Sequence, residues 1–163
     1  MSGADVRTVL VVGASRGIGL EFARQYAQAG AHVMATHRKP EDAAALHALG
    51  AQPMALDVTD AASIQALAVQ LARERIDVAV LNAGIYGPRT AHLEAVDQAT
   101  FDAVMHTNVW GPMQLVCVLA PLFVPTHGKL SLVSSRMGST ALMNDSTGWL
   151  YRASKAAANS VLR

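Results

Sequence analysis

The chain has 163 residues with 52% hydrophobic and only 5% aromatic side chains, which suits a single domain, residues 1–163, with an aliphatic core. Its 13 basic and 12 acidic residues form no run of like charge, which argues against a nucleic-acid partner and a polybasic membrane patch. A lone cysteine argues against a disulfide framework or a metal cluster. No stretch approaches the roughly 20 apolar residues of a membrane-spanning helix, so we expect a cytoplasmic protein.

Short apolar runs alternate with helical patterns along the whole chain. The runs predict five strands, at residues 8–12, 31–36, 51–56, 77–81 and 129–133. Helices are predicted between them, at residues 17–29, from Pro40 to Gly50, after a cap at Asp60, over 101–124 and from Tyr151 onward. Gly111-Pro112 should break or kink the fourth helix, in which we expect Cys117 to be a small buried residue. Residues 84–96 and 134–148 are predicted to be loops.

Strands that alternate with helices predict right-handed βαβ units and a doubly wound parallel α/β sheet, the Rossmann arrangement. Sheets of this kind bind ligands beyond the carboxyl ends of their strands. The candidate site residues of this chain follow those ends.

The first candidate site is the glycine-rich loop Gly13-Ala-Ser-Arg-Gly17-Ile-Gly19, which separates the first strand from the first helix. Glycines let a backbone turn tightly and approach a pyrophosphate, which the positive end of a helix then attracts. The spacing is GxxxGxG, and such a cluster taken alone is also compatible with a mere tight turn. The strand before it and the helix after it favour a dinucleotide site, with contacts from Gly13, Ser15, Arg16, Gly17, Ile18 and Gly19.

The end of the second strand predicts which dinucleotide binds. A cofactor without a 2′-phosphate is usually held there by an acid, but this chain reads Thr36-His37-Arg38. Guanidinium groups at Arg16 and Arg38 would suit a phosphate dianion, although both could also be solvated surface arginines. Because the acid is missing, the sequence favours NADP(H).

Two further strand ends complete the predicted binding site. Asp57-Val58 follows the third strand and is placed to meet an adenine, although an Asp in a loop is more often a turn or cap residue. Asn82-Ala83-Gly84 ends the fourth strand, where small residues would let the backbone pass a cofactor. Each signal is weak alone, but they occupy successive strand ends in the expected order.

The candidate catalytic residues are Asn108, Ser135, Tyr151 and Lys155. Tyr151 and Lys155 are four residues apart on a predicted helix and so share a face, although such a pair is also common by chance. An ammonium beside a phenol lowers the pKa of the phenol from about 10, and a phenol tuned in this way can protonate a carbonyl oxygen. Ser135 ends the fifth strand. Asn108 lies in mid-helix, where Asn is disfavoured, which indicates a polar relay.

Taken together, Gly13xxxGly17xGly19, Asn82-Ala-Gly, Asn108, Ser135 and Tyr151xxxLys155 resemble the short-chain dehydrogenase/reductase family. The long loop 135–151 and the strings SSRMGS and YRASKAAAN are similar to its sniffer- and C-factor-like carbonyl reductase branch. The resemblance runs from Thr8 to the end of the chain.

The resemblance implies an NADPH-dependent oxidoreductase that acts on a small carbonyl or alcohol. It implies that Tyr151 is the acid/base and that Lys155 holds the nicotinamide ribose while lowering the phenol pKa, so both residues also contact the cofactor. Ser135 would hydrogen-bond the substrate carbonyl, and Asn108 would position a water for a proton relay. The pair Thr36 and Arg38 resembles that of NADPH-preferring members.

The chain departs from the family pattern at three places. Val12 stands where the family usually has Thr, and Leu81 where many members have Asn, which puts a local polar contact in doubt. The family pattern also continues past Arg163, with two further strands and a substrate-covering loop. We therefore expect residues 1–163 to fold, to show little reductase activity and to self-associate through the strand at 129–133.

Two other functions are compatible with the same residues. A catalytically silent, cofactor-binding or signalling protein would keep the glycine loop and lack the substrate-covering loop. An epimerase or dehydratase could use the same sheet, but the glycine spacing and the Ser135–Tyr151 spacing fit the reductases better.

Overall fold

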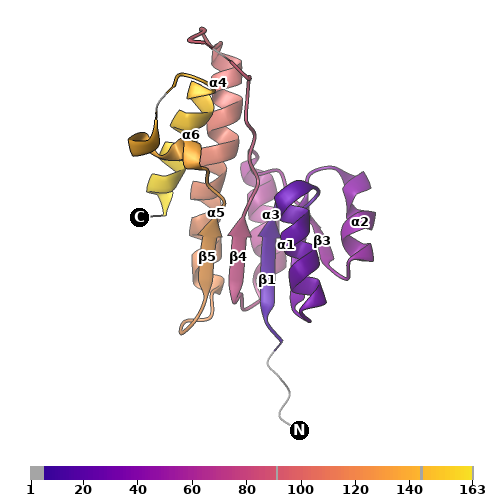
Figure 1. Cartoon of the computed structure of the whole chain (residues 1–163). Helices are drawn as coiled ribbons and strands as arrows, with labels where there is room; N and C mark the ends of the chain where they lie inside the picture. Colours follow the sequence, from indigo (N-terminus) through magenta and orange to yellow (C-terminus); the bar gives the residue numbers. More distant parts are fainter. Residues whose placement is uncertain (1–5, 91, 144, 163) are drawn as a thin grey trace.

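The computed structural model of the chain has one sheet with helices on both faces (Figure 1). The structure describes residues 6–90, 92–143 and 145–162. The strands are β1 (Thr8–Val12), β2 (His32–His37), β3 (Gln52–Ala55), β4 (Val78–Leu81) and β5 (Lys129–Leu132). They are parallel and lie in the order β3-β2-β1-β4-β5, which confirms the predicted doubly wound α/β sheet.

The centre of the sheet is β1, which pairs with β2 on one side and with β4 on the other. Residues 9–12 are fully buried because helices cover both faces of this strand. This explains why its sequence is a continuous apolar run rather than an alternating one. The edges of the sheet are β3 and β5.

Within the described residues, six α-helices connect and cover the strands. They are α1 (Gly17–Gln28), α2 (Ala43–Ala48), α3 (Ala61–Leu71), α4 (Gln98–Met105), α5 (Gly111–Leu119) and α6 (Trp149–Val161). One face of the sheet packs Leu10 and its neighbours against α3 and α5, through Leu67 and Leu115. The opposite face packs Val11 against α1 and α2, through Ala23 and Leu46.

The helix pair α4–α5 confirms that residues 101–124 are mostly helical and shows which of the two expected outcomes, a break or a kink, Gly111-Pro112 avoids. Gly111-Pro112 does not break the helical segment, because a π-helical turn, His106–Trp110, joins α4 directly to α5. Pro112 lies in the first turn of α5 and has no N–H to donate to the Asn108 carbonyl, so a regular α-helix cannot pass this point. The wider π-helical turn tolerates the absence of this hydrogen bond, so the helical segment continues from α4 into α5.

Cys117 also differs from expectation, since it is exposed. Leu115 and Leu119 are four residues apart on α5 and both are buried in the core. A residue midway between them on a helix points to the opposite side, which places Cys117 outward.

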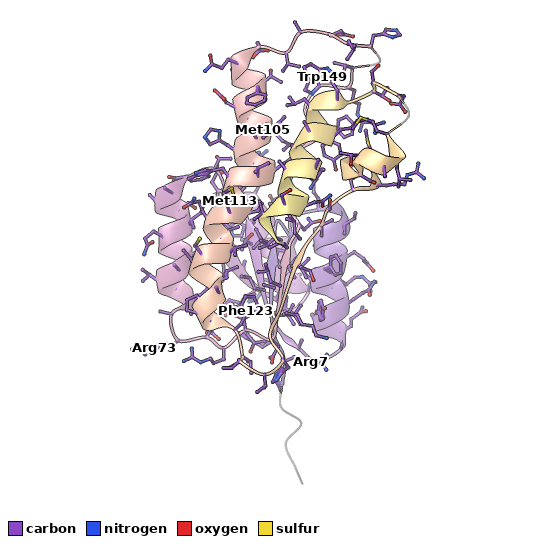
Figure 2. All side chains as sticks on the ribbon, turned by 90° about the vertical axis from the view of Figure 1, so that its left-hand side faces the viewer. Arg7, Arg73, Met105, Met113, Phe123 and Trp149 are labelled. Carbon is purple, nitrogen blue, oxygen red and sulfur yellow. The ribbon has the colours of Figure 1, made fainter. Side chains whose placement is uncertain are left out.

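The carboxyl ends of the strands and the beginning of α6 lie at the same end of the molecule (Figure 1). Figure 2 shows Trp149, the first residue of α6, at this end, with Arg7 and Arg73 at the opposite end. The predicted loop 134–148 contains two short 3-10 turns, Arg136–Gly138 and Thr140–Leu142. Arg163, where we expected the last helix to be still continuing, lies outside the described residues.

Within the part of the chain that the structure describes, no helix combines the length and the apolar character needed to cross a membrane.

Candidate functional site

A cleft of about 680 Å³ opens at the carboxyl ends of β1, β2, β3 and β4. Most of the predicted binding residues line it, namely Gly13, Ser15, Arg16, Gly17, Ile18, Arg38, Asp57, Val58, Asn82, Ala83 and Gly84. Those that do not are Gly19, Tyr151 and Lys155. The lining also includes residues that were not predicted as contacts, namely Thr36, His37, Lys39, Asp42, Leu56, Thr59, Ile85 and Thr107. All of these additional residues except Thr107 are close in sequence to the end of a strand, and this position in the sequence could have been used to predict them.

The glycines of the loop after β1 are required for different structural reasons. A Cβ on Gly13 would lie 2.7 Å from the Ala83 backbone, and one on Gly19 would collide with the Gly13 carbonyl. These two glycines therefore let the loop pack closely against the end of β4. Gly17 has a φ of +57°, and a Cβ there would meet nothing within 4 Å. Its backbone faces open space, as a loop that receives a ligand requires.

Two side chains hold this loop in place. The Gly13 N–H donates to Oγ1 of Thr36 at 2.9 Å, and Nδ2 of Asn82 donates to the Gly13 carbonyl at 2.8 Å. The ends of β2 and β4 thus fix the loop between them. Asn82, predicted as a binding residue, lines the cleft and also supports the loop.

The end of α1 that faces the loop can accept an anion. Arg16 occupies its N-cap position without a side-chain capping bond, and the first turn contains no acid. The amide N–H groups of a first helical turn lack partners within the helix and attract negative charge. This observation, with the close-packed glycines, shows that the loop fits a pyrophosphate.

The cleft is basic beside β2. Arg16, Arg38 and Lys39 line it and are exposed, and residues 38–40, directly after β2, include no acid, although Asp42 also lines the cleft. His37 is buried, with its Nδ1 2.9 Å from the Lys39 carbonyl oxygen. Such an arrangement suits a phosphate group on a ribose better than a free diol.

Asp57 serves as a turn residue and also lines the cleft. Both the hydroxyl and the N–H of Thr59 donate to its carboxylate, at 2.7 and 2.9 Å. The hydroxyl bond is the main reason that the pKa of Asp57 lies below its usual value, and the positive charge of Arg38 adds to the effect. The carboxylate is therefore fixed in the loop after β3.

A second cluster of polar side chains lies beyond the cleft, around Asn108 in the π-helical turn. Asn108 is only 1% exposed. Its Oδ1 accepts from the Ile85 N–H at 2.8 Å, and its Nδ2 donates to the Ile85 carbonyl at 2.8 Å and to Oγ of Ser154 at 2.9 Å. Ser154 in turn donates to the Tyr151 carbonyl at 2.8 Å. Both hydrogens of the Asn108 amide are thus used within the protein.

Lys155 joins this cluster from α6. The side chain is buried, and its Nζ donates to the Val133 carbonyl, just after β5, at 2.9 Å. Nζ lies 5.8 Å from the centre of the Tyr151 ring. Burial lowers the pKa of Lys155, because desolvation disfavours the ammonium.

Gly84 marks the point where the cleft meets this cluster. It lines the cleft, and a Cβ on it would lie 3.2 Å from Asn108 Oδ1 and 3.5 Å from Lys155 Nζ. The predicted binding residues and two of the predicted catalytic residues therefore form one continuous site. Sequence reasoning missed Ser154, for which the only signal is a small polar residue directly before Lys155.

Ser135 begins the 3-10 turn after β5. Its Oγ accepts from the Met137 N–H at 3.1 Å, which leaves the hydroxyl hydrogen free to donate. Gly138 presses this segment against α6, since a Cβ on it would lie 2.9 Å from the Lys155 backbone. Tyr151 stacks on a second tyrosine, Tyr86, which sequence reasoning also missed.

Comparison with known proteins identifies the family of this chain. The family model for short-chain dehydrogenases matches residues 7–163. The chain is 32% identical to the galactitol 2-dehydrogenase of Agrobacterium fabrum, over 93% of this chain and 60% of that protein. It is 31% identical to the uncharacterized oxidoreductase YbbO of Escherichia coli, over 81% of this chain and 50% of that protein. The chain thus spans between one half and three fifths of the length of these two relatives.

Solved structures with the same architecture carry NADP. A carbonyl reductase from Pseudomonas aeruginosa in complex with NADP superposes with a TM-score of 0.88 and is 36% identical, over 97% of this chain and 74% of that one. The RhlG/NADP active-site complex of the same organism gives a TM-score of 0.82 at 30% identity, over 95% of this chain and 64% of that one. The sheet order, the glycine loop and the match over residues 7–163 together show that the chain belongs to the short-chain dehydrogenase/reductase family.

Proposed function

We propose that this protein is an NADP(H)-dependent oxidoreductase that reduces the carbonyl group of a small molecule, or oxidises the corresponding alcohol. The observation that carries the proposal is the continuity of the site at Gly84, which lies against Asn108 and Lys155 and lines the dinucleotide-sized cleft. The carbonyl reductase similar to this chain was crystallised with NADP, which supports the choice of cofactor.

Different residues of the cleft would contact different parts of the cofactor. The glycine loop, with Ser15 and Ile18, and the first turn of α1 would hold the pyrophosphate, and Arg16 and Arg38 the 2′-phosphate. Asp57 and Val58 would meet the adenine, and residues 82–84 the ribose beyond it. NADP(H), when bound, supplies or accepts a hydride.

The residues beyond the cleft carry out the proton transfer between Tyr151 and the substrate oxygen. Tyr151 donates its phenolic proton to the substrate oxygen during reduction and takes it back during oxidation. The buried Lys155 places a positive charge beside the phenol, which stabilises negative charge on the phenol oxygen, and it would also hold the nicotinamide ribose when the cofactor is bound. Ser135, with its hydroxyl hydrogen free, donates a hydrogen bond to the same substrate oxygen. Asn108 fixes the Ile85 backbone beside this site, and it would position a water for the proton relay.

The proposal is tested by measuring the consumption of NADPH by the full-length protein with a panel of small aldehydes and ketones. We expect turnover that Tyr151→Phe abolishes while NADPH affinity stays nearly unchanged, because the phenol acts only where charge develops on the substrate oxygen. Lys155→Ala should lose both turnover and affinity. Tyr26→Phe, at a half-buried tyrosine of α1 that stacks on Phe22 and does not line the cleft, is the matched control. NADPH binding without turnover would show a silent cofactor-binding protein instead.

A further inference from the structure

Tyr86 lies flat against Tyr151. The centres of the two rings are 4.4 Å apart and their planes differ by 20°. Tyr86 comes from the loop after β4, whereas Tyr151 belongs to the first turns of α6. The contact therefore joins two segments that are distant in sequence, at the side chain to which we assign the proton transfer.

The backbone on both sides of Tyr86 is fixed. Ile85, directly before it, exchanges two hydrogen bonds with the Asn108 side chain, both at 2.8 Å. Gly87, directly after it, has a φ of +76° and packs against Val104, where a Cβ would approach within 2.7 Å. The Tyr86 ring is thus attached to a backbone segment that is held on both sides.

Three further contacts surround the ring of Tyr86. Its hydroxyl donates to the sulfur of Met137 at 3.8 Å, and the Arg89 guanidinium lies 4.9 Å from the ring centre. Gly148, the N-cap of α6, has a φ of +57°, and a Cβ there would collide with the Tyr86 hydroxyl. The start of the helix that carries Tyr151 therefore leaves room for this ring.

Resting on the proposed function, we propose that Tyr86 is a positioning residue that holds the Tyr151 phenol in the orientation needed for proton transfer. Tyr86 acts through its ring face, because offset stacking restricts rotation and tilting of the neighbouring ring. A proton donor works only in a narrow range of positions, and a displacement of about 1 Å can lower a rate about 100-fold.

The proposal separates the ring of Tyr86 from its hydroxyl. Tyr86→Phe keeps the stack and should retain most of the turnover, whereas Tyr86→Leu removes the ring and should lower kcat roughly 10- to 100-fold. The Michaelis constant for NADPH should stay unchanged in both variants, because Tyr86 is assigned no contact with the cofactor and acts only on the Tyr151 ring. Met137→Leu, which removes only the sulfur contact, is the matched control and should behave like the wild type.

A second readout needs neither substrate nor cofactor. In protein with ring-labelled tyrosine, the Tyr151 signal, assigned by its loss in Tyr151→Phe, should carry a ring-current shift from Tyr86. The shift should persist in Tyr86→Phe and Met137→Leu and disappear in Tyr86→Leu. Circular dichroism and thermal unfolding would establish whether Tyr86→Leu is folded. If it does not fold, Tyr86→Phe alone tests the proposal, because it must then keep both the ring-current shift and most of the turnover.

The two measurements separate this inference from the function on which it rests. Wild-type protein that turns over no carbonyl contradicts the proposed function, whatever the Tyr151 signal shows. Wild-type turnover with a Tyr86→Leu variant that keeps more than half of kcat overturns only the role of Tyr86. A Tyr86→Phe variant as impaired as Tyr86→Leu would also overturn it, because the hydroxyl rather than the stack would then matter.

Discussion

At the scale of single residues, the buried amide of Asn108 ties together three parts of the chain. Its three hydrogen bonds reach the loop after β4 and the Ser154 hydroxyl on α6, and the amide itself comes from the π-helical turn. Substitution of Asn108 would leave the half-buried N–H and carbonyl of Ile85 without this partner. An unpaired buried polar group costs about 1–3 kcal/mol.

We therefore predict that Asn108→Ala destabilises the fold by about 2–4 kcal/mol, because the Ile85 N–H and carbonyl lose their partners together. Urea unfolding monitored by circular dichroism measures the difference. The neighbouring Thr107→Ala, which removes an exposed hydrogen bond to Ala103, is the control and should cost well under half as much. Equal losses in the two variants would contradict the role given to Asn108.

Residues beside a strand end could be predicted, and residues brought together by packing could not. Gly13, Arg38 and Asp57 were found because a short apolar run marks each strand end, and these residues follow it. Tyr86 and Ser154 matter only through contacts with residues 65 and 46 positions away in sequence, namely Tyr151 and Asn108. A single sequence contains no signal of such a pairing.

At the scale of the elements, Asp77 joins three strands at the end of the sheet opposite the site. Its Oδ2 accepts from the Thr8 N–H at 2.7 Å, and its Oδ1 lies 2.8 Å from Nε2 of His127. Its backbone N–H donates to Thr8, and its carbonyl accepts from Lys129. These bonds hold the beginnings of β1, β4 and β5 together.

The Thr8 N–H, with a smaller contribution from His127, keeps the pKa of Asp77 below its ordinary value of 3.8. Folding therefore favours the carboxylate, so its contribution is present above the unfolded pKa and is lost as the pH falls through the lower, folded pKa. We predict that Asp77→Asn destabilises the protein at pH 7 and that its difference from the wild type shrinks below about pH 4. Urea unfolding at pH 7, 5 and 3 tests this. The exposed Glu94→Gln serves as the control, and a difference that does not change with pH would contradict the assignment.

The strands were predicted within a residue or two, because parallel strands buried on both faces are continuous apolar runs. The helical character of residues 101–124 was predicted, but the form of the irregularity at Gly111-Pro112 was not, because a proline indicates only that a regular helix is interrupted. The π-helical turn that accommodates it depends on packing against its neighbours, among which Gly111 approaches the Val58 carbonyl so closely that a Cβ would lie 2.6 Å away. That approach cannot be inferred from the local sequence.

At the scale of the whole molecule, β5 is an edge strand, and near it lies an apolar groove of about 560 Å³. The groove is lined by Val116, Ala120, Pro121, Phe123, Val124, Pro125, Gly128 and Leu130. Phe123 is labelled in Figure 2 on this side of the molecule. Strand edges with unpaired backbone groups and apolar surface nearby favour association.

We predict from this that residues 1–163 form a homo-oligomer in solution. Light scattering after size-exclusion chromatography would report the mass. Leu130→Lys, a charged substitution on the edge strand, should shift the distribution toward monomer, whereas Val69→Lys on the exposed side of α3 should leave it unchanged. A monodisperse monomer at micromolar concentration would contradict the prediction.

The cleft is assigned to NADP(H), so the decisive measurement is the preference between NADPH and NADH, which fluorescence titration of both cofactors gives. One charge-assisted phosphate contact is worth about 1.5–3 kcal/mol, so NADPH should bind roughly tenfold more tightly or better. Arg38→Ala should remove most of this preference while leaving NADH affinity nearly unchanged. Arg24→Ala, on the outer face of α1 and paired with Glu21, should keep the preference. Equal affinities for the two cofactors, or a preference that survives Arg38→Ala, would contradict the assignment of the cleft.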